Sequence, residues 1–208
     1  MKDIMTKFSV LFCRYFLIIS CVMCSFLFAQ QDPQITHNMF NKFMYNPAVA
    51  GAYPELHATL LHRSQWVGID GAPSTSNLNA HAYVGQIRGG VGINVLNDRA
   101  GMFSAKTISL SYAYQLGLGP HHQLGMGLSF GLMQYGYDGQ WVTPDQTSDA
   151  FLPPSNSSKS VPDFGLGFYL TSENYYLGLS ATHIIPMEVD FNGTATYNQA
   201  RHYYFLAG

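Results

Sequence analysis

An unbroken alternation of apolar residues with small or polar residues constrains the fold of this chain more than any other feature. In residues 107–116 the apolar positions are Ile108, Leu110, Tyr112, Tyr114 and Leu116. In residues 123–132 they are Leu124, Met126, Leu128, Phe130 and Leu132. Successive side chains of a β-strand point to opposite faces. The period therefore predicts two strands, each with one apolar face and one small or polar face.

The same alternation recurs, less regularly, along the rest of the chain. Further strands are expected in residues 56–65, 77–84, 90–95, 164–170 and 175–182, and one more is expected to begin near Arg201. Most connections are short, but residues 138–162 and 185–200 form two long polar ones. Antiparallel strands with short turns at one end and long loops at the other are typical of outer-membrane barrels.

Composition favours a membrane barrel over a soluble β-sandwich, although both architectures produce alternation. Charged residues make up 11% of the chain, against roughly 25% in an average soluble domain. The clearest strands have about the length that crosses a bilayer at a tilt. Tyrosines near strand ends are expected to form an interfacial girdle, namely Tyr112, Tyr114, Tyr135, Tyr137, Tyr175 and Tyr176. A soluble sandwich remains the alternative fold.

Residues 1–29 are expected to be a secretory signal peptide, which leaves residues 30–208 as the barrel domain. Lys2, Lys7 and Arg14 precede an apolar run that ends at Ala29, as in exported proteins. A membrane anchor is the first alternative, but Arg14 leaves an apolar stretch shorter than the ~20 residues that a spanning helix needs. A lipoprotein signal with Cys21 as the modified residue is the second alternative.

The end of the chain raises the question of barrel closure. Residues 202–208 are strand-like, and we count about eight strands in all. Because strands inside hydrocarbon must pair all their backbone groups, they have to close into a barrel. We therefore expect an all-β, transmembrane antiparallel β-barrel of the outer-membrane type that is truncated at its C-terminus. A complete eight-stranded barrel is the alternative.

A search for catalytic or cofactor chemistry gives little. The sequence has no zinc-protease, P-loop, nucleophile-elbow or dinucleotide-binding motif in a usable context. The glycines at 125, 127, 165 and 167 lie inside alternating strands, so we interpret them as packing positions on the lumen face. The pair His121-His122 is a weak candidate for a metal site. We expect no enzyme activity, no cofactor and no bound metal, and the net charge of −2 gives no indication of nucleic-acid binding.

Short motifs near the start of the expected mature chain carry a more specific signal. They are Tyr45-Asn46-Pro47-Ala48-Val49-Ala50-Gly51, then Arg63-Ser64-Gln65-Trp66, then Gly71-Ala72-Pro73-Ser74-Thr75, and later Asp98-Arg99-Ala100-Gly101. In this order the motifs resemble the PorP/SprF family of the Bacteroidetes type IX secretion system. The resemblance runs from about Gln34 to the end, although members of that family continue for roughly another third.

The resemblance implies a non-enzymatic component of the cell outer membrane that helps to export or surface-anchor a large adhesin, as in gliding motility. Its implied partners are the C-terminal sorting domain of the adhesin, other type IX secretion subunits and outer-membrane lipid. A passive porin is the alternative function, and an outer-membrane lipid hydrolase is a third. The matching positions are interpreted as structural or interaction residues: Asn46, Pro47, Ala48, Gly51, Arg63, Gln65, Trp66, Pro73, Asp98 and Gly101.

Individual motif residues have structural interpretations of their own. The prolines shape turns, and Gly51 and Gly101 permit backbone angles that other residues avoid. Trp66 suits a membrane interface. Arg63 needs a carboxylate partner if it faces the lumen, because a charge on the lipid side costs about 2–4 kcal/mol at the midplane.

Overall fold

The computed structural model describes residues 32–33, 35–36, 38–137, 157–191 and 196–208. Residues 33–208 form one compact unit, and the description below concerns that unit. The signal peptide predicted for residues 1–29 lies outside the described residues. No helix among those described is long and apolar enough to cross a membrane.

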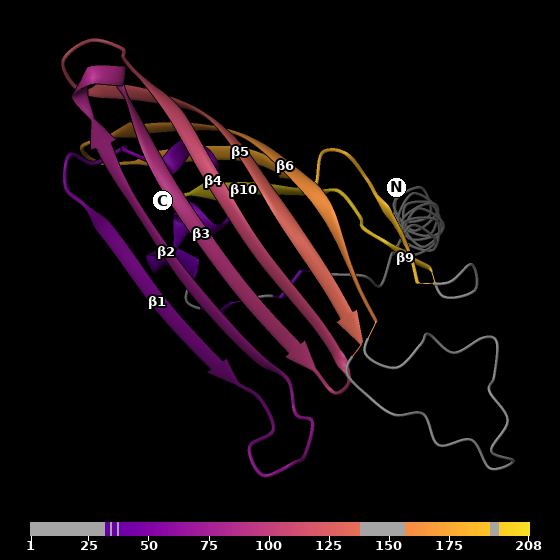
Figure 1. Ribbon diagram of the computed structural model, residues 1–208. Helices are drawn as coiled ribbons and strands as arrows, with labels where there is room; N and C mark the ends of the chain where they lie inside the picture. The colour runs from indigo at the N-terminus through magenta and orange to yellow at the C-terminus, as the bar shows by residue number, and fades with distance from the viewer. Residues whose placement is uncertain (1–31, 34, 37, 138–156, 192–195) are drawn as a thin grey trace, which may run out of the picture. The chain divides into compact units, whose positions relative to one another are not determined.

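Eight antiparallel strands form the main sheet, in the order β1-β2-β3-β4-β5-β6-β7-β10 (Figure 1). Their bounds are β1 His57–Ser64, β2 Ser74–Val84, β3 Gly89–Ala100, β4 Phe103–Gly117, β5 His122–Tyr137, β6 Ser157–Ser172, β7 Tyr176–Thr182 and β10 His202–Ala207. A short pair, β8 (Glu188–Asp190) and β9 (Thr196–Asn198), forms a second sheet. Sequence neighbours are therefore spatial neighbours nearly throughout.

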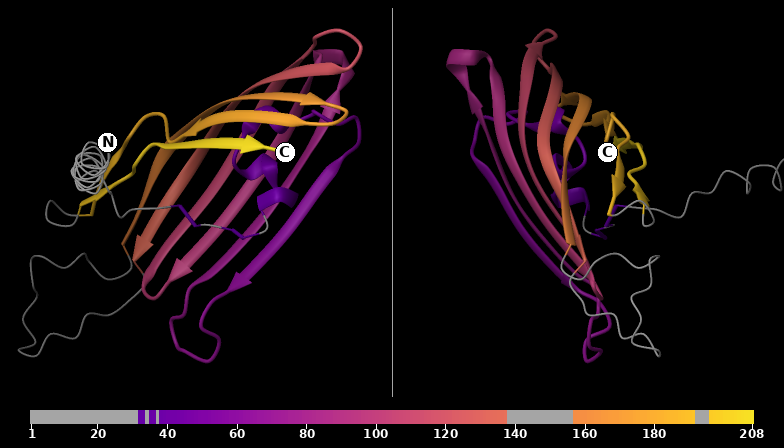
Figure 2. Two further views of the ribbon diagram at one scale, coloured as in Figure 1. Left: turned by 180° about the vertical axis from the view of Figure 1, so that it is seen from behind. Right: turned by 45° about the vertical axis from the view of Figure 1, so that its right-hand side comes forward.

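The main sheet is strongly curved, with β1 and β10 at its two edges (Figure 2). The connections β2–β3, β4–β5 and β6–β7 lie at one end of the sheet, which we call the short-turn end. The other connections, β1–β2, β3–β4, β5–β6 and β7–β10, lie at the opposite end, which we call the long-loop end. This curled half-barrel confirms the predicted antiparallel barrel type.

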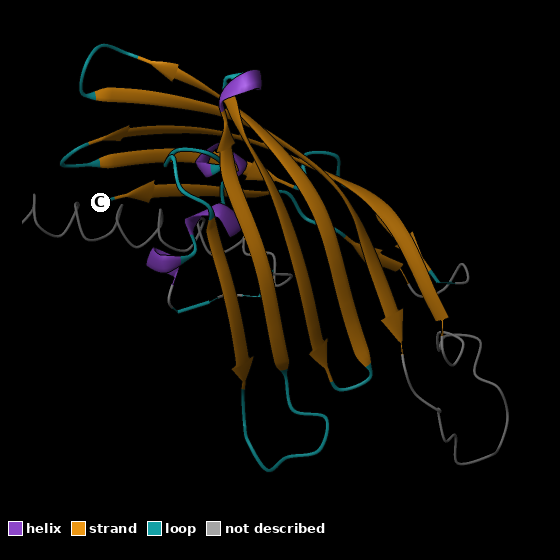
Figure 3. Cartoon of the chain, turned by 60° about the vertical axis from the view of Figure 1, so that its left-hand side comes forward, coloured by secondary structure: helices purple, strands orange, loops and turns teal. Residues whose placement is uncertain are grey.

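The two faces of the sheet differ as the alternation predicted. Outward side chains on the convex face are apolar and exposed, for example Leu110 at 61% and Leu128 at 60%. Their neighbours along the strands, Ser111 and Gly127, are buried on the concave face. Two short 3-10 helices, η2 (Lys42–Met44) and η3 (Pro47–Val49), lie against the concave face (Figure 3). They follow η1 (Asn38–Phe40), which has no buried residue. A fourth, η4 (Gly85–Ile87), lies in the β2–β3 turn.

Exposure of the apolar convex face to water is unfavourable, because apolar surface is less stable in water than in an apolar environment by about 25 cal/mol per Å². In lipid the same surface is at no disadvantage, and the backbone hydrogen bonds of the sheet satisfy the strands internally. The exposed apolar side chains therefore mark the convex face as the lipid-facing side of an outer-membrane sheet.

Half of the predicted tyrosine girdle is wrong. Tyr135 is only 3% exposed and packs on the concave face beside Phe103, and Tyr137 packs against Phe191. Tyr176 lies on the concave face, where the Lys42 ammonium stands 3.7 Å from the centre of its ring. These tyrosines have the register of the small, inward positions. The prediction was wrong because it considered only that they lie near strand ends.

Both long connections differ from the prediction. Strand β6 begins at Ser157 and includes Pro162, which the sequence placed in a loop. Pro162 is tolerated because β7 pairs only with residues 166–171 of β6, so that this part of β6 has a neighbour on one side alone. In residues 185–200, β8 and β9 form a small hairpin that the alternation did not reveal.

Candidate functional site: a motif segment bound to the glycine-lined concave face

Residues 43–52, here called the plug segment, occupy the concave face. Asn46 caps η3, since its side-chain oxygen accepts a 2.9 Å hydrogen bond from the Ala48 backbone N–H. Pro47 follows at the first helical position, where its missing N–H costs nothing. Gly51 ends the turn with a φ of +68°, which glycine adopts without strain. The sequence Asn46 to Gly51 therefore encodes a compact turn that starts and stops within six residues.

Glycines on three strands, β3, β5 and β6, allow the plug segment to approach the sheet closely. A Cβ atom on Gly125 or Gly127 would overlap the backbone of Ala48, and one on Gly90 would overlap the backbone of Ala50. A Cβ on Gly167 would overlap the Asn46 side chain. The predicted packing role is thereby confirmed for the glycines at 125, 127 and 167. What they pack against is the chain's own N-terminal motif.

Side-chain hydrogen bonds from the sheet hold the backbone of the plug segment. The Gln115 amide donates to the carbonyls of Ala50 at 2.6 Å and Ala48 at 3.2 Å. The Ser180 hydroxyl donates to the Tyr45 carbonyl at 2.7 Å. In the opposite direction, the fully buried Asn46 side chain donates to the Phe168 carbonyl at 2.9 Å. Buried polar groups of a non-repetitive segment need such partners, and the sheet supplies them.

A buried amide network fixes the chain just before the plug segment. Asn41 donates to Asn77 at 2.8 Å and accepts from Asn79 at 2.7 Å. Asn77 also donates to Asn94 on β3 at 2.7 Å. All these asparagines except Asn94 are buried. An inward asparagine on an alternating strand needs a hydrogen-bond partner, either water or another polar group. Here the partner is Asn41, which is distant in the sequence.

The other motif residues gather at the long-loop end of β1 to β4. Arg63, Thr75 and Asp98 lie opposite one another in register on adjacent strands. They share the concave face, and the Thr75 hydroxyl donates to the Asp98 carboxylate at 2.6 Å. Arg63 thus faces the lumen in the same row as a carboxylate two strands away. The predicted requirement for an acid near Arg63 has a candidate in Asp98.

Backbone contacts join the two connections at this corner. The Gln65 N–H donates to the Pro73 carbonyl at 2.9 Å and closes the β1–β2 loop. The Gly101 N–H in the β3–β4 turn donates to the Gly71 carbonyl at 2.8 Å. Trp66 has a φ of +50° and is 68% exposed at the loop surface. Motifs separated by thirty or more positions in the sequence therefore form one structural corner.

A second inward element covers the concave face near the long-loop end. Val189 and Phe191, both 2% exposed, pack against Met133, Tyr135 and Val161. The loop that carries them starts at His183, whose Nδ1 lies 2.7 Å from a carboxylate oxygen of Asp163. We call the five apolar residues the inner apolar cluster. The concave face is therefore lined by two segments of the chain itself, the plug segment and the loop that carries Val189 and Phe191.

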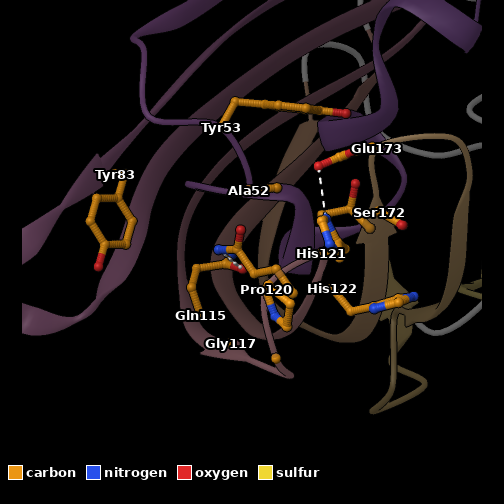
Figure 4. A pocket seen from close by; sticks show the side chains of 13 residues that line it. Ala52, Tyr53, Tyr83, Gln115, Gly117, Pro120, His121, His122, Ser172 and Glu173 are labelled. Carbon is orange, nitrogen blue, oxygen red and sulfur yellow. Dashed lines mark hydrogen bonds and ion pairs between the residues drawn. The ribbon is translucent and has the colours of Figure 1, made fainter.

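A pocket of about 530 Å³ opens at the short-turn end, next to the last residues of the plug segment (Figure 4). Ala52 and Tyr53 line one side, and residues of the β4–β5 and β6–β7 turns line the other. His121 pairs with Glu173 at 3.0 Å, and His122 hydrogen-bonds to the hydroxyl of Tyr175 at 3.0 Å. The two histidines thus have separate partners, and both hydrogen bonds join the neighbouring turns. Sequence reasoning did not find this pocket.

Comparison with known protein families identifies the family of this chain. The family of type IX secretion system membrane proteins PorP/SprF matches residues 27–208. No curated protein and no solved structure matches significantly. Since the match covers most of the chain, the chain belongs to the PorP/SprF family and is a membrane component of type IX secretion. Together with the lipid-facing sheet, this places it in the outer membrane.

Proposed function

We propose that this PorP/SprF protein is a non-enzymatic outer-membrane component that helps to export a large adhesin, or to anchor it at the cell surface. The adhesin is recognised through its C-terminal sorting domain, with other type IX secretion subunits as further partners. The observation that carries the proposal is that the plug segment and the inner apolar cluster line the concave face. A sheet lined in this way suits a docking scaffold better than a conduit.

The long-loop end is the surface that we assign to the adhesin. Short turns face the periplasm and long loops face outward in outer-membrane barrels, and loops on a rigid scaffold commonly carry function. The corner formed by Arg63, Trp66, Thr75 and Asp98 lies at this end and contains most of the family motif residues outside the plug segment. We assign it to partner contact, and the motif from Asn46 to Gly51 to packing.

We also assign the long β5–β6 connection, at the same end of the sheet, to partner contact, and deletion of residues 141–154 tests this assignment. This range stops short of Ser157, where β6 begins, and so avoids the strand residues in the predicted loop. We expect normal amounts of the protein in the outer membrane but no adhesin at the cell surface. The matched control replaces Leu118 and Pro120 of the β4–β5 turn with glycine and should leave display intact. Normal display after the loop deletion would refute the proposal.

A passive porin is the competing function, and the lined concave face argues against it. Planar-bilayer recording separates the two functions, because a porin conducts ions without any partner. The proposal expects conductance at the background level for the wild-type protein.

The proposal includes export through a signal peptide at residues 1–29. N-terminal sequencing of the protein recovered from outer membranes should begin at or close to Gln30. Residues 30–208 contain no cysteine, because the three cysteines of the sequence lie in its first 24 residues. Single introduced cysteines then report on one position at a time.

A further inference from the structure

The apolar convex face ends abruptly at one register row near the long-loop end. One row of paired residues contains Leu78, Val95, Ile108, Leu132 and Pro162. The next outward row, two residues further along each strand, contains Ser76, Asn97, Lys106, Gln134 and Ser160. Every residue of the first row is apolar and every residue of the second is polar. This boundary is where the hydrocarbon of a bilayer meets its headgroups.

Two cations stand immediately beyond this boundary. Lys106 on β4 pairs in register with Asn97, and Arg99 is the next outward residue on β3. The two are diagonal neighbours, whose Cα atoms in such a pair are roughly 7–8 Å apart. Both are exposed, and neither makes an ion pair with any residue that the structure describes. Among the described strands, they are the Lys and Arg residues with an outward register.

A hollow of about 590 Å³ lies on the convex face at the same place. Its floor is the Leu96–Thr107 pair. On one side it is lined by Val95, Ile108 and Leu132, and on the other by Asn97, Lys106, Gln134 and Ser160. The hollow is therefore amphipathic and has its polar half toward the long-loop end. It matches a molecule with acyl chains below and an anionic group above.

We propose that this hollow binds the phosphorylated headgroup of a glycolipid from the outer leaflet. The Lys106 ammonium and the Arg99 guanidinium bind the phosphate, since both cations form charge-assisted hydrogen bonds with phosphate oxygens. The amides of Asn97 and Gln134 face the sugar, and the first methylenes of the acyl chains lie on Val95, Ile108 and Leu132. The glycolipid is chosen over a phospholipid because the long-loop end of the sheet faces outward.

The test is native mass spectrometry of the full-length protein purified in detergent and mixed with defined lipids. The wild-type protein should retain bis-phosphorylated lipid A. The double variant R99Q/K106Q should retain at least fivefold less of it. Lys159 supplies the matched control, because it lies near the same end of β6 but has the register of the concave face; K159Q should bind like the wild-type protein.

Three comparisons separate the possible ligands. Dephosphorylated lipid A should bind at least fivefold more weakly, while phosphatidylglycerol and inorganic phosphate should compete poorly. Equal retention of lipid A by R99Q/K106Q and K159Q would overturn the proposal. Equal binding of phosphatidylglycerol, or full competition by inorganic phosphate at the same concentration, would overturn the choice of a glycolipid. If the double variant fails to reach the membrane, the single variants K106R and K106Q are compared instead. Only K106R keeps the positive charge, so only K106R should retain the lipid.

Discussion

Substitution of Gly127 by alanine should loosen the plug segment without unfolding the sheet. The new Cβ would overlap the main chain of Pro47 and Ala48, and main-chain atoms cannot rotate away as a side chain can. Overpacking of this kind costs about 1–3 kcal/mol. At 1.4 kcal/mol per factor of ten, the undocked population should rise about 5- to 150-fold.

Maleimide labelling of a cysteine at Val49 measures that population. Val49 is 3% exposed in the docked plug segment, and cysteine is close to it in size. The thiol of V49C should therefore react slowly, and that of V49C/G127A faster by the factor given above. Outer-membrane recovery of both variants shows that the sheet has formed.

Gly165 provides the control for this experiment. It also lies on the concave face, but a Cβ there would meet mainly the Ser129 hydroxyl, which can rotate. V49C/G165A should label at the V49C rate. If G127A left labelling unchanged, or if G165A raised it equally, the close docking of the plug segment on Gly127 would be refuted.

Three further outcomes are expected. Leu128→Arg puts a charge on the lipid face at a cost of about 2–4 kcal/mol and should lower the recovery of the protein from outer membranes. Ser129→Arg points to the concave side and should be recovered better. Equal recovery of the two variants would contradict the assignment of the faces. Gln115→Ala leaves two buried carbonyls without their donor, at about 1–3 kcal/mol each, and should speed labelling of V49C; an unchanged rate would show that these hydrogen bonds contribute nothing. Phe191→Ala removes a buried ring at about 3–5 kcal/mol and should accelerate amide hydrogen exchange in residues 187–191; unchanged protection would mean that the ring does not hold the inner apolar cluster together.

The strands and their faces were accessible from the sequence because the period of two is a local property. Leu128 and Ser129 are adjacent on a strand and therefore point to opposite faces of the sheet, and the alternation predicts this from the sequence alone. Each of the eight strands of the main sheet overlaps a segment that the alternation placed, although β3, β5 and β6 extend several residues beyond it. Among the exceptions, Tyr135 and Tyr137 have inward register and aromatic character at once, and they pack against Phe103 and Phe191 on the concave face.

The plug segment was not accessible, because it depends on contacts between distant residues. The motif from Asn46 to Gly51 suggested a turn but not its location. A signal did exist in four glycines of inward register on three strands, namely Gly90, Gly125, Gly127 and Gly167. Four missing side chains on one face leave room for another backbone. Likewise, the inward amides of Asn77 and Asn79 indicated a polar partner without identifying Asn41. The β8–β9 hairpin is too short for alternation to reveal it.

The central claim is that the convex face of this sheet lies in the outer-membrane bilayer. Spin labels on single cysteines at 128, 129 and 130, in protein reconstituted into lipid, test it most directly. Oxygen, which concentrates in lipid, should broaden the signals at 128 and 130 strongly, while a water-soluble nickel complex should not. Position 129 should respond weakly to oxygen. Nickel access at 128 and 130, with no alternation against 129, would mean that the apolar face is in water and would contradict the account.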